Sequence, residues 1–150
     1  MKENVEKEAA FTLIELLLIV ALFSVLVTAV VIGVRQASVK AKLTRIATDL
    51  SELRKVADDI YYQGFEGYAN LCESQGGILN VSVDPRIETL EQDIERMGGQ
   101  VICYADEDNY CISVDLPSTN WFYCLDSRGN FVRHPSNPCS DANSVCPLTP

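Results

Sequence analysis

The sequence FTLIELLLIVALFSVLVTAVVIGV, residues 11–34, decides the fold of this chain. Its 24 residues carry a single charge, that of Glu15. A helix of this length spans ~36 Å at ~1.5 Å per residue, which is enough to cross a hydrocarbon core of ~30 Å. Residues 11–34 therefore predict a helix that serves as a membrane segment.

The residues that follow, 35–63, are polar but continue the helical pattern. One apolar stripe recurs with alternating spacings of four and three, and consists of Val39, Leu43, Ile46, Leu50, Leu53, Ala57 and Ile60. Its mean period of 3.5 residues also fits a coiled-coil seam. We favour packing against the rest of the same chain, because the stripe is short and strand-like sequence follows it. One helix over residues 11–63 is the simplest interpretation.

Beyond Gly64 and Gly67 the pattern changes from helix to short strands. Residues 68–80 predict a loop, and Asp84 followed by Pro85 predicts the start of a second helix that ends at residues 98–99, a glycine pair. Strands are expected at residues 101–105, 110–116 and 121–125, with a weaker fourth around 131–132. The short connections predict an antiparallel meander and an α+β fold.

The charges are unevenly distributed along the chain. Residues 57–126 carry fourteen acids against only Arg86 and Arg96. An acidic surface of this kind repels phosphate backbones, so we expect no direct nucleic-acid partner for this region. A basic stretch at residues 35–45 follows the apolar run, where anionic lipid headgroups would attract it.

All six cysteines fall in the second half of the chain: Cys72, Cys103, Cys111, Cys124, Cys139 and Cys146. An even number in one soluble region predicts disulfides and an oxidising, extracytoplasmic location. The sequence lacks CxxC pairs and has a single histidine, so we expect no metal site and no cofactor.

The disulfide pairing stays open at this level. If residues 106–108 form the first hairpin loop, Cys103 lies opposite Cys111, but pairing with Cys72 or Cys124 is equally allowed. The Pro- and Ser-rich tail, residues 134–150, would be ordered by a bond between Cys139 and Cys146 or by one to the body.

The strongest local motif is AAFTLIELL, residues 9–17, at the start of the apolar run. It resembles the class III signal of type IV pilins and secretion pseudopilins. That resemblance implies a leader, residues 1–10, which a prepilin peptidase removes by cutting between Ala10 and Phe11 and then methylating the amine of Phe11. It also implies that Glu15 sets the axial register by pairing with that amine on the next subunit.

An acid at position 15 is also reasonable on physical grounds. An ionised carboxylate at the bilayer centre costs ~2.5–3.5 kcal/mol on insertion scales, so it should lie near a helix end or have a partner. Glu15 lies one turn from the start of the run, where the positive end of the helix dipole stabilises it. The simpler alternative is a signal-anchor helix whose Glu15 extends to the interface.

The resemblance implies a pilin fold, with the first half of the long helix in the membrane and the second half packed on a small antiparallel sheet. The expected segments are the leader, the filament-core helix over residues 11–34, the head over residues 35–133 and the tail. The function would be structural rather than enzymatic, and we expect a major or minor pilin. The alternatives are a pseudopilin of a secretion or DNA-uptake system and a non-polymerising membrane-anchored binding module.

The implied partners are other pilins, the peptidase and an inner-membrane assembly platform. Counted by Lys and Arg alone, the basic flank at residues 35–45 would place the C-terminus in the cytoplasm. The clustered cysteines and the motif favour the opposite orientation. We expect a single-pass membrane protein with its C-terminus outside, which then enters an extracellular or periplasmic filament.

Two further candidate sites follow the long helix, one in the head and one in the tail. Asp106, Glu107 and Asp108 offer the oxygen ligands that calcium prefers, although a plain acidic hairpin turn is the commoner explanation. His134, in the tail, has no second histidine with which to build a nucleophile and base. The sequence therefore presents no catalytic constellation.

Overall fold

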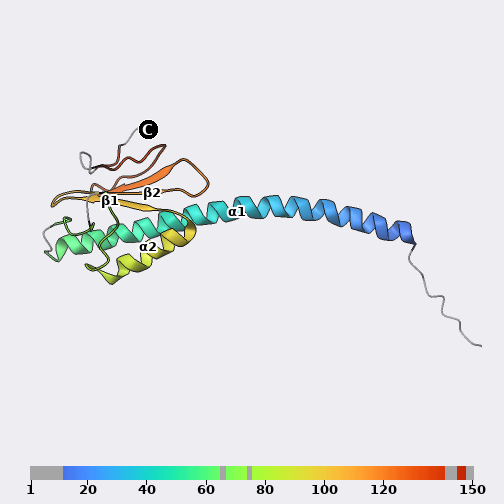
Figure 1. Cartoon of the computed structure of the whole chain (residues 1–150), viewed down its shortest axis with the longest axis horizontal. Coiled ribbons are helices and arrows are strands. Elements are labelled where there is room, and N and C mark those ends of the chain that lie inside the picture. The colour runs from blue at the N-terminus through green and yellow to red at the C-terminus, as the bar shows by residue number, and fades with distance from the viewer. Residues whose placement is uncertain (1–11, 65–66, 74–75, 141–144, 148–150) are drawn as a thin grey trace, which may run out of the picture. The chain divides into compact units, whose positions relative to one another are not determined.

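The computed structural model describes residues 12–64, 67–73, 76–140 and 145–147. Figure 1 shows two helices, α1 (Leu13–Tyr62) and α2 (Pro85–Met97), and a four-stranded sheet. The chain divides into two compact units, Met1–Ser38 and Val39–Pro150. The second unit is called the head below. The predicted helix over residues 11–63 agrees closely with α1.

The strands of the head are β1 (Val101–Ala105), β2 (Tyr110–Asp115), β3 (Phe122–Asp126) and β4 (Phe131–His134). They pair in the order β1-β2-β3-β4, and every pair is antiparallel. The predicted α+β class and meander are confirmed, and the weak fourth strand is real and two residues longer than expected.

The helix α2 begins and ends where the sequence signals predict. The Asp84 carboxylate accepts a hydrogen bond from the backbone N–H of Arg86, and Pro85 occupies the first turn. At the other end Gly98 adopts a left-handed conformation with φ 92°, and its N–H bonds back to the last turn.

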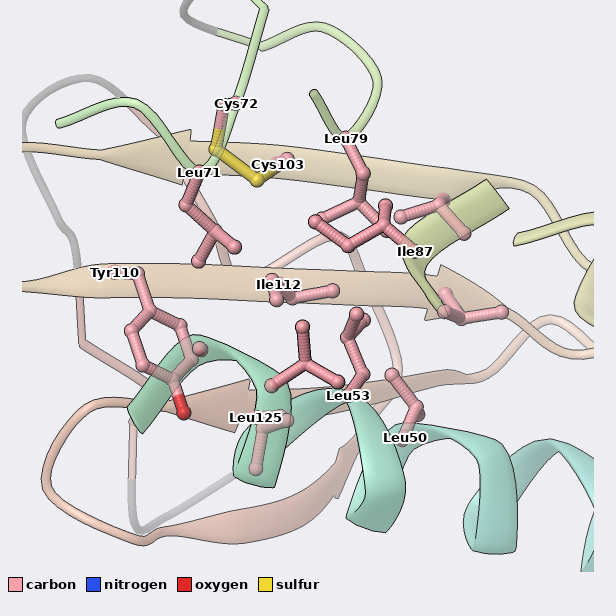
Figure 2. Close-up of a cluster of buried hydrophobic side chains, with 14 of the residues drawn as sticks. Leu50, Leu53, Leu71, Cys72, Leu79, Ile87, Cys103, Tyr110, Ile112 and Leu125 are labelled. Atoms are coloured by element: carbon pink, nitrogen blue, oxygen red, sulfur yellow. A yellow bond between two sulfur atoms is a disulfide. The ribbon is translucent and has the colours of Figure 1, made fainter. Parts of the chain in front are cut away.

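The core of the head lies between the sheet and the apolar stripe of α1. Ile46, Leu50, Leu53, Ala57 and Ile60 are buried with α2 residues and with the inner face of the sheet. Figure 2 shows Leu50 and Leu53 approaching the strands near Ile112. The stripe therefore packs within its own chain, and this interpretation, rather than a coiled coil, is confirmed.

A loop closes the free edge of β1. The disulfide Cys72–Cys103 attaches this loop to the strand, as Figure 2 shows. Backbone bonds join the same elements, since the N–H of Cys103 donates to the carbonyl of Gly77 at 2.9 Å. The loop therefore occupies the backbone groups of Cys103 at this edge, and another chain cannot pair with β1 at that residue.

The tail covers the outer face of the sheet. Two disulfides, Cys111–Cys139 and Cys124–Cys146, attach it to β2 and β3, and we call this pair of bonds the tail clasp. Because helices cover one face and the tail the other, five consecutive residues of β2 are buried without alternation. The prediction that disulfides order the tail is confirmed, and both bonds run to the body.

One register expectation is wrong. Cys103 pairs with Ile112, and Cys111 lies opposite Tyr104. The cause is a turn of four residues rather than three, since Ala105 pairs with Tyr110. A shift of one residue turns every side chain to the other face, so Cys103 points into the core while Cys111 points to the tail.

Candidate functional site

A reciprocal pair of hydrogen bonds defines the start of α1. Glu15 Oε2 accepts from the backbone N–H of Thr12 at 3.0 Å and from its hydroxyl at 2.8 Å. In return, the N–H of Glu15 donates to Thr12 Oγ1 at 3.3 Å. This is a capping box, in which a threonine and a glutamate three residues later satisfy each other's backbone donors. Glu15 is therefore fixed at the positive end of the helix.

The capping box leaves part of the Glu15 carboxylate unused. Both bonds from Thr12 end on Oε2. Within the described part of the chain, Oε1 accepts no hydrogen bond. A carboxylate has about four lone-pair sites, so Glu15 retains acceptor capacity for a further donor.

The described side chains on either side of Glu15 are apolar and exposed. Each of a row of large apolar residues is at least 57% exposed: Leu13, Ile14, Leu16, Leu17, Leu18, Val20, Leu22, Phe23, Val25, Leu26, Val27, Val30 and Val34. Removing one such side chain from water contributes about 1.5–3 kcal/mol. Large contiguous apolar surfaces mark interaction or membrane sites, so this surface needs a covering partner.

The polar side chains within this surface are satisfied by the helix itself. The hydroxyl of Ser24 donates to the carbonyl of Val20 at 2.8 Å, and that of Thr28 donates to the carbonyl of Ser24 at 2.8 Å. Side chains bonded in this way need no water. Glu15 is the single charged residue of residues 11–34. When a partner or a membrane covers the apolar surface, Glu15 therefore brings a charge into apolar surroundings.

Among the described residues, no helix is both long enough and apolar enough to cross a membrane. The expectation that residues 11–34 span a membrane is therefore not confirmed. Two other sequence predictions, cleavage after Ala10 and methylation of Phe11, fall outside the described residues.

The acidic hairpin between β1 and β2 uses its first carboxylate to form the turn. Asp106 Oδ1 accepts from the backbone N–H groups of Asp108 at 2.8 Å and Asn109 at 2.7 Å. Throughout the described part of the head, the one group whose ligand atoms converge closely enough for a metal consists of Cys111, Cys124 and Cys139. The three acids of the calcium hypothesis do not form such a group.

The single histidine makes only local contacts. His134 Nδ1 lies 2.9 Å from the carbonyl oxygen of Ser136 and 3.2 Å from its hydroxyl. Within the described residues no carboxylate orients the ring. His134 is the last residue of β4 and is half-buried, and Ser136 lies in the exposed bend that follows the strand. A serine beside a histidine without a third group is not a catalytic triad.

Asp126 is a structural residue that the sequence analysis missed. It is fully buried at the end of β3, and its carboxylate accepts four hydrogen bonds. Oδ1 bonds the N–H groups of Arg128 and Asn130, while Oδ2 bonds the Asn130 side chain and the N–H of Cys146. One side chain thus forms the β3–β4 turn and anchors the tail. In the sequence, this role of Asp126 is indicated only by the turn-forming residues 127–130 that follow it.

A second buried acid lies on α1. The Asp49 side chain is 4% exposed, its Oδ1 lies 3.5 Å from Arg45 Nε, and its Oδ2 has no partner among the described residues. Burial raises the pKa of Asp49; the positive charge of Arg45 opposes this rise and the negative charge of Asp93 adds to it. The ionised form of Asp49 is therefore disfavoured in the folded head.

Comparisons with protein-family models, with curated proteins and with solved structures find no significant match to this chain.

Proposed function

We propose that this chain is a pilin-like structural subunit that assembles into a filament through residues 11–34. One observation carries the proposal: a row of exposed apolar side chains on α1 whose only charge is a Glu15 held in a capping box. The pilin fold, with α1 packed on a small sheet, is part of the same proposal. The sequence motif at residues 9–17 supports it independently.

The apolar surface of α1 serves in two surroundings. Before assembly it lies in the lipid of the inner or cytoplasmic membrane, with the head outside. After assembly it packs against the same segment of neighbouring subunits. Both surroundings exclude water from the apolar side chains, so transfer between them loses little of the hydrophobic stabilisation.

Glu15 is the register point of this assembly. Once the leader is removed by a prepilin peptidase, Phe11 carries an amine with a reference pKa of about 7.7–8.0, which is largely cationic at neutral pH. The Oε1 atom, which accepts no bond among the described residues, can receive that amine from the adjacent subunit while Thr12 keeps Oε2. Register and helix capping are therefore compatible in this chain.

The head forms the outer surface of the filament, and its clustered disulfides suit an oxidising space outside the cytoplasm. The assembly platform and sister pilins are the partners that this role requires. A pseudopilin of a secretion or DNA-uptake system would use the same segment in the same way.

The test compares Glu15→Ala with Glu52→Ala in the cells that make the protein. Glu52 is an exposed glutamate of the same helix that pairs with Lys55, and so controls for loss of a helical acid. We expect Glu15→Ala to abolish filaments or reduce them strongly while Glu52→Ala assembles normally. The intact mass of the wild-type subunit should correspond to residues 11–150 with one methyl group.

Two results would contradict the proposal. One is a chain from mature cells that still carries residues 1–10, which would favour a non-polymerising anchored module. The other is equal assembly by the two variants, which would remove the register role of Glu15.

A further inference from the structure

Three sulfur atoms of the tail clasp, those of Cys111, Cys124 and Cys139, lie within 4.8 Å of one another at one buried point. Cys124 Sγ lies 3.6 Å from Cys111 Sγ and 3.9 Å from Cys139 Sγ, although it is bonded to neither. Its own disulfide partner is Cys146. All four residues are at most 3% exposed and form a cluster of their own, lined by Tyr104 and Val132.

Two of the separations match those of a zinc tetrathiolate. Four sulfur atoms placed tetrahedrally at ~2.3 Å from Zn²⁺ lie about 3.8 Å from one another. The two non-bonded separations are already within about 0.2 Å of that value. The two bonded pairs would have to move apart, which happens when a disulfide is reduced. The Cys146 side chain would also have to turn toward the other three, because its sulfur atom lies outside the group of Cys111, Cys124 and Cys139, whose sulfur atoms are all within 4.8 Å of one another.

The four ligands also come from two layers. Cys111 and Cys124 project from neighbouring strands of the sheet, and Cys139 and Cys146 belong to the tail that covers it. Two ligands from each layer can surround an ion on opposite sides, as tetrahedral coordination requires.

Hydrogen bonds hold the tail cysteines in place independently of the sulfur bonds. The N–H of Cys146 donates to Asp126 Oδ2 at 2.9 Å. The N–H of Cys139 donates to Asn137 Oδ1 at 3.1 Å, and the same oxygen accepts from Ser113 of β2 at 2.7 Å. None of these hydrogen bonds involves a sulfur atom, so reduction of the disulfides does not itself remove them.

We propose that the chain, when these four cysteines are reduced, binds one Zn²⁺ through Cys111, Cys124, Cys139 and Cys146. Each disulfide takes up two electrons from a phosphine, which becomes the phosphine oxide, and two protons from water, and yields two thiols. Zinc then replaces the four thiol protons, which pass to solvent. Every newly synthesised chain begins with its cysteines as thiols, so zinc would hold the tail on the sheet until a thiol oxidant forms the two disulfides and releases the ion.

The third disulfide provides an internal control. Cys72 and Cys103 belong to the main core, on the other face of the sheet. Two cysteines alone cannot complete a site of four ligands. Zinc should therefore affect the four clasp cysteines and leave this pair unaffected.

The first measurement uses the wild-type full-length chain in detergent micelles, fully reduced with a phosphine under argon. Alkylation of each cysteine is followed by mass spectrometry with one equivalent of Zn²⁺ and with chelator. We expect zinc to slow alkylation of the four clasp cysteines and to leave the rates of Cys72 and Cys103 unchanged.

Native mass spectrometry should find one zinc per chain, and Co²⁺ should give the visible bands of a tetrahedral site. Equal alkylation with and without zinc, or protection of only two cysteines, would overturn the proposal.

The second measurement compares two variants. Loss of a residue that only hydrogen-bonds a metal ligand weakens a metal site by about 10- to 100-fold, so loss of a ligand in Cys139→Ser should weaken zinc binding by more than about 100-fold. The double variant Cys72→Ser with Cys103→Ser should bind zinc as tightly as the wild-type chain. Wild-type affinity in Cys139→Ser would refute the site, and the alkylation pattern remains decisive if either variant fails to fold.

Discussion

Replacement of Asp126 by asparagine tests the bond that anchors the tail to the β3–β4 turn. Asparagine keeps one oxygen, which can still accept from the N–H groups of Arg128 and Asn130. It places an NH₂ group at the position of Oδ2, where the Asn130 side chain and the N–H of Cys146 now donate. The Asn130 side-chain amide and the Cys146 N–H, which are both donors, then face the new NH₂ group instead of an acceptor in a fully buried site.

The expected loss follows from these contacts. A hydrogen bond to a charged group contributes about 1.5–3 kcal/mol, so two lost bonds amount to roughly 3–6 kcal/mol. The Asn130 amide can turn over and offer its oxygen, which recovers one of them. We therefore expect a net decrease of about 1.5–3 kcal/mol in the free energy of unfolding, a large part of the 5–15 kcal/mol typical of a domain.

Urea unfolding followed by the fluorescence of Trp121, the only tryptophan of the chain, measures this loss. With a slope of about 1–3 kcal/mol/M, the midpoint should fall by roughly 0.5–3 M. Asp108→Asn is the matched control, because Asp108 is exposed, lies in the neighbouring turn and makes no side-chain hydrogen bond within the described residues. A loss below about 0.5 kcal/mol in Asp126→Asn, or an equal loss in both variants, would refute the reasoning.

Three further predictions concern the head. Leu53→Ala removes a fully buried side chain of α1 and should lower the free energy of unfolding by about 2–5 kcal/mol in the same assay; a smaller effect would show that the core collapses around the cavity. Gly67→Ala should destabilise the head more than Gly64→Ala, because both residues have positive φ but only at Gly67 would the new Cβ lie 1.8 Å from the carbonyl oxygen of Glu107; equal melting temperatures would argue against this contact. The third prediction concerns Asp49, whose pKa is raised in the folded head. Above this folded-state pKa, ionisation of Asp49 destabilises the head. The destabilisation is relieved as the pH falls through the folded-state pKa toward the ordinary value of 3.8. The stability of Asp49→Asn relative to wild type should therefore be most favourable at pH 7 and decline toward pH 4, and a difference that is independent of pH would contradict the shift.

Much of the fold was predictable because its signals are local. The stripe of α1, the caps of α2 at Asp84 and Gly98, and the turn residues between the strands each specify their element without reference to the rest of the chain. The register of the first hairpin was not predictable in the same way. Turns of three and four residues fit the sequence DEDN equally well, and the choice depends on how Asp106 bonds the turn.

The tertiary features could not be predicted from one sequence. Six cysteines allow fifteen pairings, and only the folded chain brings Cys139 and Cys146 to the outer face of the sheet. Asp126 looked like one acid among many, because its four donors come from a turn and from a tail twenty residues away. The role of Glu15 was suggested by its sequence neighbours, whereas its capping bond to Thr12 becomes visible only in the structure.

The distribution of the disulfides has a mechanical consequence. All three bonds join the loop, the sheet and the tail, and α1 contains no cysteine. Tension applied along α1 reaches the sheet through apolar side chains such as Leu50 and Leu53 and through no covalent cross-link. Under a rising load the head should therefore yield first by shear between the helix and the sheet. The loop, the sheet and the tail should stay joined to one another by their disulfides.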